Sequence, residues 1–334
     1  LGWLYQFYIS EKKSDVMAQK GPLQVNEIPA VTQIFTPDWL VRYLTENTIT
    51  RSWLRIKNQT STIGTDCYYA HSNATDEVPN IKAPEELSVL DPACGSGHML
   101  LGAFDALYKI YESEGYSKSE IPSKIIKNNL YGLDVCPRAA QIASLSITLK
   151  AREYDKRYLD PSRFIKPNIS VIPDKKMASS CVDWLQTCWD KHNRNGSLCQ
   201  TIAKLGDGEG LGSLNRPSSA GIPDNTLSAE IYRLSDDYLG TSSPLRNNIE
   251  NCLESLRILG GKYQVIITNP PYVYSRNLAS DIREKLFKNF PASKADFFSA
   301  FIQRSIELVE PKGIIGMMTP NVWMYITSHF KLRK

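Results

Sequence analysis

The tetrapeptide Asn-Pro-Pro-Tyr, residues 269–272, carries the side chains best suited to chemistry in this chain of 334 residues. It directly follows the apolar run 265–267, which is typical of a buried parallel strand. Ligands bind beyond the carboxyl ends of such strands. An amide, a rigid turn and an aromatic ring at this point suit a flat, amino-bearing group that reacts at its nitrogen. The simpler alternative is a turn that only closes the strand.

A glycine-rich motif, DPACGSG at residues 91–97, follows the short apolar run 87–90 and precedes a helix-like stretch. Gly95 and Gly97 would let the backbone approach a ligand closely. The amide groups at the start of the helix favour a carboxylate, and Asp91 could bind an ammonium group. The motif therefore matches both charged ends of an amino acid. The alternative is a structural turn with Asp91 as a cap.

An acidic residue, Asp134, follows the next strand candidate, residues 130–133. Such a residue typically accepts hydrogen bonds from the ribose hydroxyls of an adenosine group. Its spacing of roughly forty residues from the glycine motif exceeds the usual dinucleotide spacing and argues against NAD. It could instead cap the helix that Pro137 begins. An amino acid and an adenosine recognised on one sheet together describe S-adenosylmethionine.

The elements that must position these residues alternate between strand and helix. The alternation predicts an α/β fold with a doubly wound, mostly parallel, Rossmann-like sheet that is incomplete at the C-terminus. Further strands are expected at residues 169–172, within the segment YQVIITNPPY, and at 313–319. A helix with several phenylalanines is expected at about 294–309.

The chain divides into four expected segments. Residues 206–248 are rich in glycine, serine, proline and asparagine, which predicts an irregular insertion, and the polar stretch 57–84 predicts a surface loop. The segments are a helical N-terminal part at 1–86, the first half of the core at 87–173, the insertion at 174–260 and the second half of the core at 261–334.

Bulk composition limits the class of protein. A hydrophobic content of 42% with 22% charged residues indicates a globular protein, and no apolar run is long enough to span a bilayer. The net charge of +4 does not by itself argue for nucleic acid. The start lacks an initiator methionine and a signal pattern, so we expect the interior of a longer protein.

The seven cysteines lack CxxC spacing and fit a reducing cytoplasm better than a disulfide framework. Cys181, Cys188, His192 and Cys199 form a loose cluster that could hold zinc. Their irregular spacing favours scattered thiols instead, so we predict no metal.

Taken together, the motifs resemble the N6-adenine DNA methyltransferases of the gamma arrangement. In that family an FTP element comes first, then DPACGSG, an acidic strand end and NPPY. This chain has the same order, with FTP at 35–37. One motif alone is ambiguous, whereas four in order are specific. The likeness covers the chain except the 174–260 insertion.

Within that class, GWLYQFYISEKK and TPNVWMYITSHFKLR resemble the PglX-type methyltransferases of BREX phage-defence systems. Those proteins are much longer and carry a C-terminal region for target recognition. The resemblance implies a fragment that contains the catalytic core of an adenine-specific DNA methyltransferase. It further implies a role in phage defence or restriction-modification.

The resemblance also implies roles for individual residues. The Asn269 side-chain oxygen and the Pro270 carbonyl would accept N–H groups from adenine N6, while Pro271 stiffens the turn. Tyr272 would stack on the flipped base, and Phe297 would lie near it. S-adenosylmethionine would be bound by Phe35, Thr36, Pro37, Asp91, Ala93, Gly95, Gly97 and Asp134. On spacing alone Phe297 is more typical of a core residue, and Thr36 also suits a helix cap. His98 has no acidic partner nearby in sequence and is assigned no role.

The expected partners are double-stranded DNA with a flipped adenine and other subunits of a defence system, without a membrane. Basic residues in 274–294 could contact phosphates, although Asp281 and Glu284 among them also suit a solvated helix. Two alternatives remain open at this point. One is methylation of RNA or of a protein glutamine, and the other is a cofactor-binding scaffold without turnover.

Overall fold

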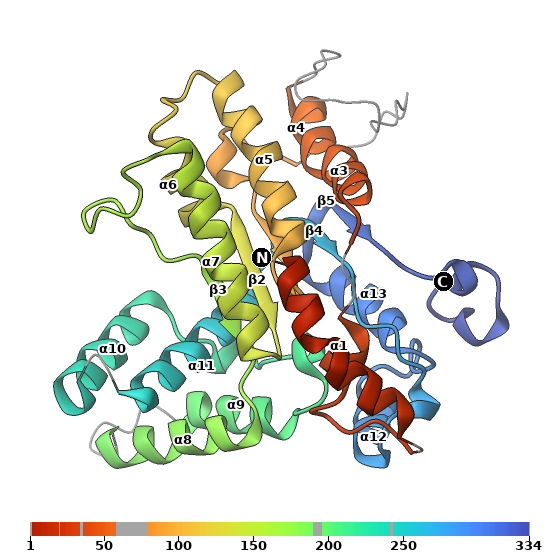
Figure 1. The fold of residues 1–334 in the computed structure, drawn as a ribbon. Helices are drawn as coiled ribbons and strands as arrows, with labels where there is room; N and C mark the ends of the chain where they lie inside the picture. The colour runs from red at the N-terminus through yellow and green to blue at the C-terminus, as the bar shows by residue number, and fades with distance from the viewer. Residues whose placement is uncertain are drawn as a thin grey trace.

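The computed structural model describes residues 2–19, 21–33, 36–57, 79–189, 196–240 and 243–333 (Figure 1). Phe35, His192 and most of the expected loop at 57–84 lie outside the described residues. No described helix is long and apolar enough to cross a membrane.

One parallel sheet of five strands organises the described part of the chain, in the order β3-β2-β1-β4-β5. The expected α/β fold with a parallel sheet is confirmed. The strands are β1 (Val89–Asp91), β2 (Leu130–Asp134), β3 (Asn168–Val171), β4 (Tyr263–Thr268) and β5 (Val309–Met317). β5 begins four residues earlier than the expected 313 and has a register irregularity opposite 263–265.

Strand β1 lies at the centre of the sheet, because Val89 pairs with Leu130 of β2 on one side and with Val265 of β4 on the other. Parallel strands buried on both faces read as continuous apolar runs, and β4 follows this rule. Alternate side chains point to opposite faces. Val89 and Val265 therefore enter one core cluster, and Leu90 enters another.

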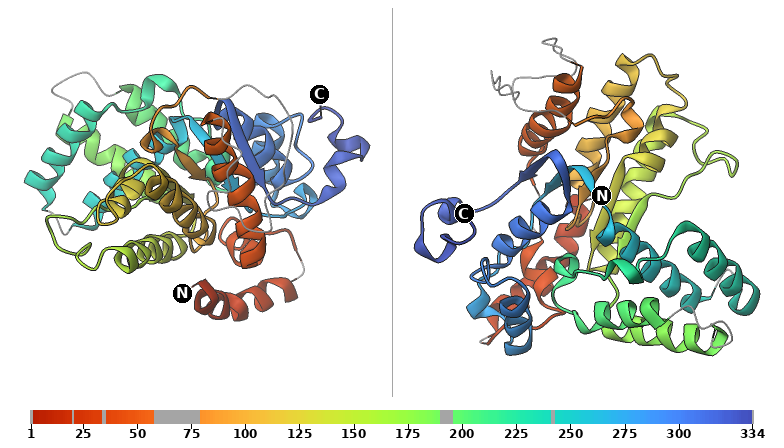
Figure 2. Two further views of the ribbon diagram at one scale, coloured as in Figure 1. Left: turned by 90° about the horizontal axis from the view of Figure 1, so that it is seen from above. Right: turned by 180° about the vertical axis from the view of Figure 1, so that it is seen from behind.

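Helices cover both faces of the sheet, as Figures 1 and 2 show. The first face is covered by α3 (Asp38–Thr45), α5 (His98–Ser113), α6 (Ile121–Asn128) and α7 (Pro137–Tyr154). Trp53 of α4 (Arg51–Ile56) is fully buried in that layer. The other face is covered by α8 (Lys175–Trp189), α9 (Gly196–Asp207) and α11 (Pro244–Gly260).

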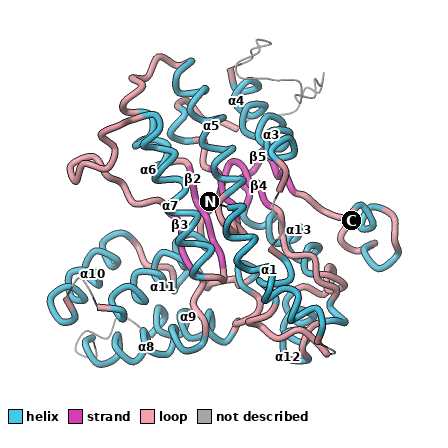
Figure 3. The backbone as a smooth tube through the Cα atoms, viewed as in Figure 1, coloured by secondary structure: helices cyan, strands magenta, loops and turns pink. Residues whose placement is uncertain are grey.

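The segment expected to be an irregular insertion is mostly helical (Figure 3). Besides α8, α9 and α11 it contains α10 (Asn225–Leu239), and among its described residues the longest stretch between these helices is 208–224. The turn-forming residues delimit helices instead of preventing them. Asp224 accepts a hydrogen bond from the Leu227 amide at the start of α10, and Pro244 begins α11. α11 then buries an apolar stripe that includes Ile249, Leu253 and Leu256.

Two further pairs of helices come from the N-terminal part of the chain and from the segment after β4. The N-terminal part forms α1 (Gly2–Ala18) and α2 (Ile28–Thr32), and the segment after β4 forms α12 (Ser280–Asn289) and α13 (Phe297–Leu308). In Figure 1, α1 runs from near the middle of the view down towards α12. These elements bring residues from both ends of the chain to the carboxyl edge of the sheet.

Candidate active site

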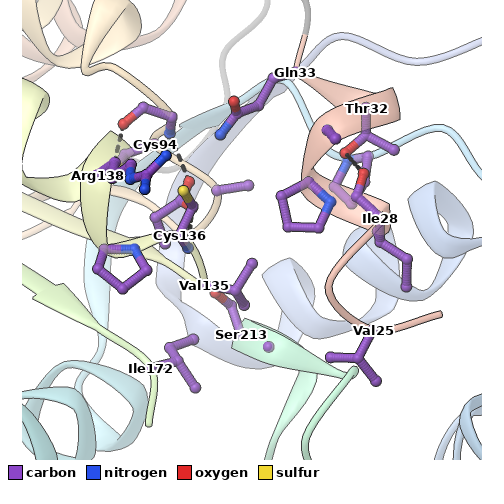
Figure 4. A pocket seen from close by; sticks show the side chains of 18 of the residues that line it. Val25, Ile28, Thr32, Gln33, Cys94, Val135, Cys136, Arg138, Ile172 and Ser213 are labelled. Atoms are coloured by element: carbon purple, nitrogen blue, oxygen red, sulfur yellow. Dashed lines mark hydrogen bonds between the residues drawn. The ribbon is translucent and has the colours of Figure 1, made fainter. Parts of the chain in front are cut away.

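A cavity of about 680 Å³ opens at the carboxyl ends of β1, β2, β3 and β4 (Figure 4). Of the residues assigned to the cofactor or the base from the sequence, eight line it: Thr36, Asp91, Ala93, Gly95, Asp134, Asn269, Pro271 and Phe297. Its volume is typical of a site for a small molecule or cofactor. His98 also lines the cavity, whereas Pro37, Gly97, Pro270 and Tyr272 are not among the lining residues.

Gly95 and Gly97 of the glycine-rich motif have different structural roles. Both have left-handed backbone, with φ of +52° at Gly95 and +87° at Gly97, a region that favours glycine. A Cβ on Gly95 would meet nothing within 4 Å, whereas one on Gly97 would lie 3.0 Å from Ala143 of α7. Gly95 therefore shapes the cavity, and Gly97 allows α5 to pack closely against α7.

Asp134 ties the ends of β1 and β2 together. Its carboxylate accepts hydrogen bonds from the Gly95 amide at 2.8 Å and from the Cys136 amide at 2.7 Å. Burial raises the pKa of this carboxyl group, and the hydrogen bonds from the two amides oppose the rise. A carboxylate in this position remains an acceptor for further hydroxyl groups, because each oxygen has two lone pairs.

Asp91 is almost fully buried, with 1% of its surface exposed. One carboxyl oxygen accepts from the Thr268 hydroxyl at 2.7 Å and from the Ala93 amide at 3.1 Å. Burial raises the pKa of Asp91 to about 7, although both hydrogen bonds act to lower it. The group is thus poised to change its charge near neutral pH, which is frequent at functional sites.

Asn269 has its side-chain amide held from two sides. Its Nδ2 donates to the Thr36 hydroxyl at 3.1 Å, and its Oδ1 accepts from the Tyr272 hydroxyl. The Tyr272 hydroxyl also lies 2.9 Å from the carbonyl oxygen of Met318. Burial raises the pKa of Tyr272 to about 12, so this hydroxyl is a neutral donor at physiological pH. The helix cap expected at Thr36 is not formed, because α3 begins without a side-chain cap. The Thr36 hydroxyl instead accepts the hydrogen bond from Asn269.

Phe297 is buried, with 2% exposed, and belongs to an apolar cluster together with Phe301 and Val273. It also lines the cavity, so both roles considered for it from spacing are compatible with its position. Pro270 and Pro271 hold the turn without cis peptide bonds, since the described backbone has none.

Several cavity residues were not anticipated from the sequence. The loop 208–213 of the insertion lines one side, and Glu11, Lys12 and Asp15 of α1 line another. His98 does have an acidic partner, because its Nε2 lies 2.9 Å from Asp38 Oδ1. Burial lowers the pKa of His98, and Asp38 opposes this. Asp38 lies 60 positions away, so no local signal reveals the pair.

The described residues contain no group of three or more His, Cys, Asp or Glu side chains arranged to hold a metal ion. Cys181 and Cys199 are both buried, while His192 of the cluster considered for zinc lies outside the described residues. Cys181 instead contacts Cys252, with sulfur atoms 3.3 Å apart.

Comparison with known families gives two matches. Residues 128–334 match the family described as Eco57I restriction-modification methylase. Residues 58–195 match the family described as N-6 DNA Methylase. The first match covers the Asn-Pro-Pro-Tyr turn and Asp134, and the second covers the glycine motif.

Two curated relatives align with the whole chain. The adenine-specific methyltransferase BrxX of Escherichia coli O9:H4 (strain HS) is 31% identical over 366 aligned positions. The adenine-specific methyltransferase PglX of Lacticaseibacillus casei (strain Zhang) is 32% identical over 352 positions. The chain spans 30% and 29% of their respective lengths. Among solved structures, the Type ISP restriction-modification enzyme LlaGI in complex with a DNA substrate mimic aligns at 16% identity with a TM-score of 0.49, covering 97% of this chain and 21% of that one.

Proposed function

The chain belongs to the Eco57I restriction-modification methylase family, and from this premise we propose that it forms the catalytic core of an adenine-specific DNA methyltransferase. In this proposal S-adenosylmethionine donates a methyl group to the N6 amino group of adenine in double-stranded DNA. The family match supports the reaction class, and the arrangement of the cavity supports the donor and the acceptor.

The order of the strand ends is the observation that carries the proposal. Along the sheet edge, Ile172 follows β3, Asp134 ends β2, Asp91 ends β1 and Asn269 follows β4. A purine, a ribose, an amino acid and a methyl acceptor would meet these groups in that sequence. S-adenosylmethionine has its purine, ribose and amino acid in the same linear order, with the sulfonium methyl group between the ribose and the amino acid. In this proposal the acceptor that Asn269 holds meets that methyl group.

The residues around the cavity fit this cofactor by their chemistry. The Asp134 carboxylate can accept from ribose hydroxyls, and the ionised Asp91 can pair with the ammonium group. The start of α5 offers the amide groups that every helix leaves without internal partners, which suits the carboxylate. Val135 and Ile172 add apolar surface for the purine. When bound, the cofactor supplies an electrophilic methyl group at its sulfonium centre.

Asn269 would then orient the acceptor. The bond to Thr36 fixes the orientation of the amide, and Oδ1, which has two lone pairs, would accept an N–H from adenine N6. A tyrosine hydroxyl has one proton, and Tyr272 can direct it to the Met318 carbonyl when Asn269 Oδ1 binds the base. The Pro270 carbonyl would accept the second N–H. Positioning and electrostatics of this kind lower a barrier without a strong base.

We also propose that the protein works in a BREX-type phage-defence or restriction-modification system. The names of the two curated relatives support this setting. Duplex DNA with one adenine flipped out of the helix is the proposed substrate, since the N6 group must leave the stack to reach Asn269.

Transfer of a labelled methyl group to duplex DNA by the natural full-length protein tests the proposal. Asn269→Ala is expected to lower kcat by about 100-fold, because one preorganised hydrogen-bonding group is lost. Asn225→Ala is the matched control, because Asn225 is exposed on α10 and does not line the cavity. Undiminished transfer by Asn269→Ala would overturn the assignment.

The choice of acceptor is tested in the same assay with DNA, RNA and protein offered in parallel. Preferential labelling of RNA or protein would show that DNA is not the preferred substrate and would contradict that part of the proposal. Calorimetric binding of the cofactor without transfer to any of the three would instead indicate a scaffold.

A further inference from the structure

The loop of residues 208–213, Gly-Glu-Gly-Leu-Gly-Ser, connects the end of α9 to the rest of the insertion and lines the cavity along its whole length. None of the motifs that identify the family falls in this loop. Figure 4 shows Ser213 close to Val135, at the end of the cavity that Ile172 lines. The loop thus reaches the ends of β2 and β3 from a segment that lies far from them in sequence.

Side-chain hydrogen bonds hold the loop against the core. The buried hydroxyl of Ser213 donates to the carbonyl oxygen of Pro92, directly after Asp91. Asn215 Nδ2 donates to the carbonyl oxygens of Gly208 and Gly212 at 3.2 and 3.0 Å, which closes the loop on itself. The Glu209 carbonyl accepts from Lys285 of α12 at 3.2 Å. The loop is therefore a wall of the cavity that its own hydrogen bonds and two other parts of the fold support.

Two of the three glycines in the loop have a backbone conformation that other residues rarely adopt. Gly210 and Gly212 have φ of +91° and +54°, in the left-handed region. A Cβ on Gly212 would lie 2.7 Å from Val135 Cγ1, and one on Gly210 would lie 3.1 Å from Ile282 Cγ1. A Cβ at position 212 would therefore force the loop or the Val135 side chain, beside Asp134, to shift.

We propose that the loop 208–213 is part of the cofactor site and that its backbone contacts the adenosine half of S-adenosylmethionine. This inference rests on the proposed function. Ser213 anchors the loop to Pro92 at the end of β1, and Gly212 packs on Val135, which follows Asp134 and belongs to the apolar surface assigned to the purine. The loop therefore borders the part of the edge assigned to the adenosine half. Asn269, at the acceptor end, lies beyond these contacts along the sheet.

In this proposal the insertion contributes a wall of the cofactor site. It supplies a glycine backbone that packs against Val135 and so borders the part of the cavity that Val135 and Ile172 line. A bulkier residue at position 212 would displace the loop or the Val135 side chain and change the shape of this part of the cavity.

Calorimetry with S-adenosylmethionine and S-adenosylhomocysteine on the natural full-length protein tests the inference. Gly212→Ala is expected to weaken both ligands by about tenfold, which corresponds to the loss of one good contact. Gly115→Ala is the matched control, since Gly115 also has positive φ, at +83°, but faces open space away from the cavity. Its affinity should match that of the wild type.

A double variant separates the local clash from general damage. Val135→Ala removes the methyl group that the new Cβ would meet, so Gly212→Ala combined with Val135→Ala should bind about as well as Val135→Ala alone. If Gly212→Ala does not fold, hydrogen exchange on the wild type decides. Ligand should protect the amides of 208–213, and unchanged exchange there would overturn the inference.

The two proposals fail in different ways. Wild-type protein that does not bind S-adenosylmethionine would contradict the proposed function. Wild-type binding with equal affinity for Gly212→Ala would contradict only the role of the loop.

Discussion

Asn269 Nδ2 donates a hydrogen bond to Thr36 Oγ1 over 3.1 Å, although the two residues are 233 positions apart. Thr36 is 4% exposed, so water competes little for this bond. The bond fixes the orientation of the amide, because it holds the nitrogen toward Thr36 and so turns Oδ1, which also accepts from Tyr272, to the other side. Through it the N-terminal segment fixes the orientation of the proposed catalytic side chain, besides lining the cavity.

Thr36→Val should therefore lower kcat for methyl transfer, because it keeps the shape of the side chain and removes the acceptor. A net loss of about 1–1.5 kcal/mol for one hydrogen bond predicts a decrease of about tenfold. Thr36→Ser retains the hydroxyl and should keep most of the activity. Steady-state kinetics with both variants measure the effect.

A role confined to the cofactor would give a different pattern. KM for S-adenosylmethionine would then rise in Thr36→Val while kcat stayed unchanged. That result would remove Thr36 as a positioning residue for Asn269.

Tyr272 offers a second test, because its ring and its hydroxyl can be separated. The resemblance assigns the ring to stacking on the base, and the structure ties the hydroxyl to Asn269 and Met318. Stacking of one base on an aromatic ring contributes about 1–3 kcal/mol, so Tyr272→Ala should weaken DNA binding by about ten- to a hundredfold. Tyr272→Phe keeps the ring and should stay within about threefold of the wild type.

Fluorescence titration with duplex DNA measures both variants, and kcat reports on the hydroxyl. Equal losses in Tyr272→Phe and Tyr272→Ala would assign the importance to the hydroxyl, and stacking would be excluded.

Asp91 predicts a pH dependence of stability. Burial raises its pKa to about 7, above the model-compound value of 3.8, so the folded state binds an extra proton between these values. Because the folded state then holds more protons than the unfolded state, the free energy of unfolding falls as pH rises from about 4 to about 7. Asp91→Asn should flatten this part of the profile, as measured by urea unfolding at a series of pH values.

The same carboxyl group predicts a pH dependence of cofactor binding. An ammonium group pairs with the ionised form, so binding below pH 7 must release a proton from Asp91. Affinity for S-adenosylmethionine should rise from about pH 5.5 to pH 7, and calorimetry in buffers of different ionisation enthalpy should detect the proton. Affinity independent of pH in this range would exclude Asp91 as the partner of the ammonium group.

The strands and the sheet type could be predicted because the buried parallel strands are short apolar runs bounded by turn residues, as in 263–268. The position of β4 beside β1 could not, since pairing between residues 89 and 265 leaves no local pattern. The role of the loop 208–213 could not be predicted for a similar reason, because its composition indicates only an irregular stretch. In the sequence, glycines that line a cavity cannot be distinguished from glycines of a solvent-exposed loop. Only the folded structure shows that Gly212 lies against Val135.

Gly95 and Gly97 belong to one motif yet predict different consequences of substitution. The Cβ of an alanine at position 95 would meet no atom within 4 Å. Gly95→Ala should therefore lower the free energy of unfolding only by the cost of a positive φ, about 1 kcal/mol. It should also weaken cofactor binding, because Gly95 lines the cavity. An Ala at Gly97 adds a contact of 3.0 Å with Ala143 to a similar backbone strain, so it should destabilise by about 2–4 kcal/mol.

Denaturant unfolding and calorimetry on the two variants separate these effects. Gly97→Ala should shift the unfolding midpoint more, and any protein that remains folded should bind the cofactor with nearly normal affinity, since Gly97 does not line the cavity. The reverse ranking, with Gly95→Ala the less stable protein, would mean that the tight approach of α5 to α7 does not limit the fold. In that case the requirement for glycine at position 97 would have to come from its backbone conformation alone.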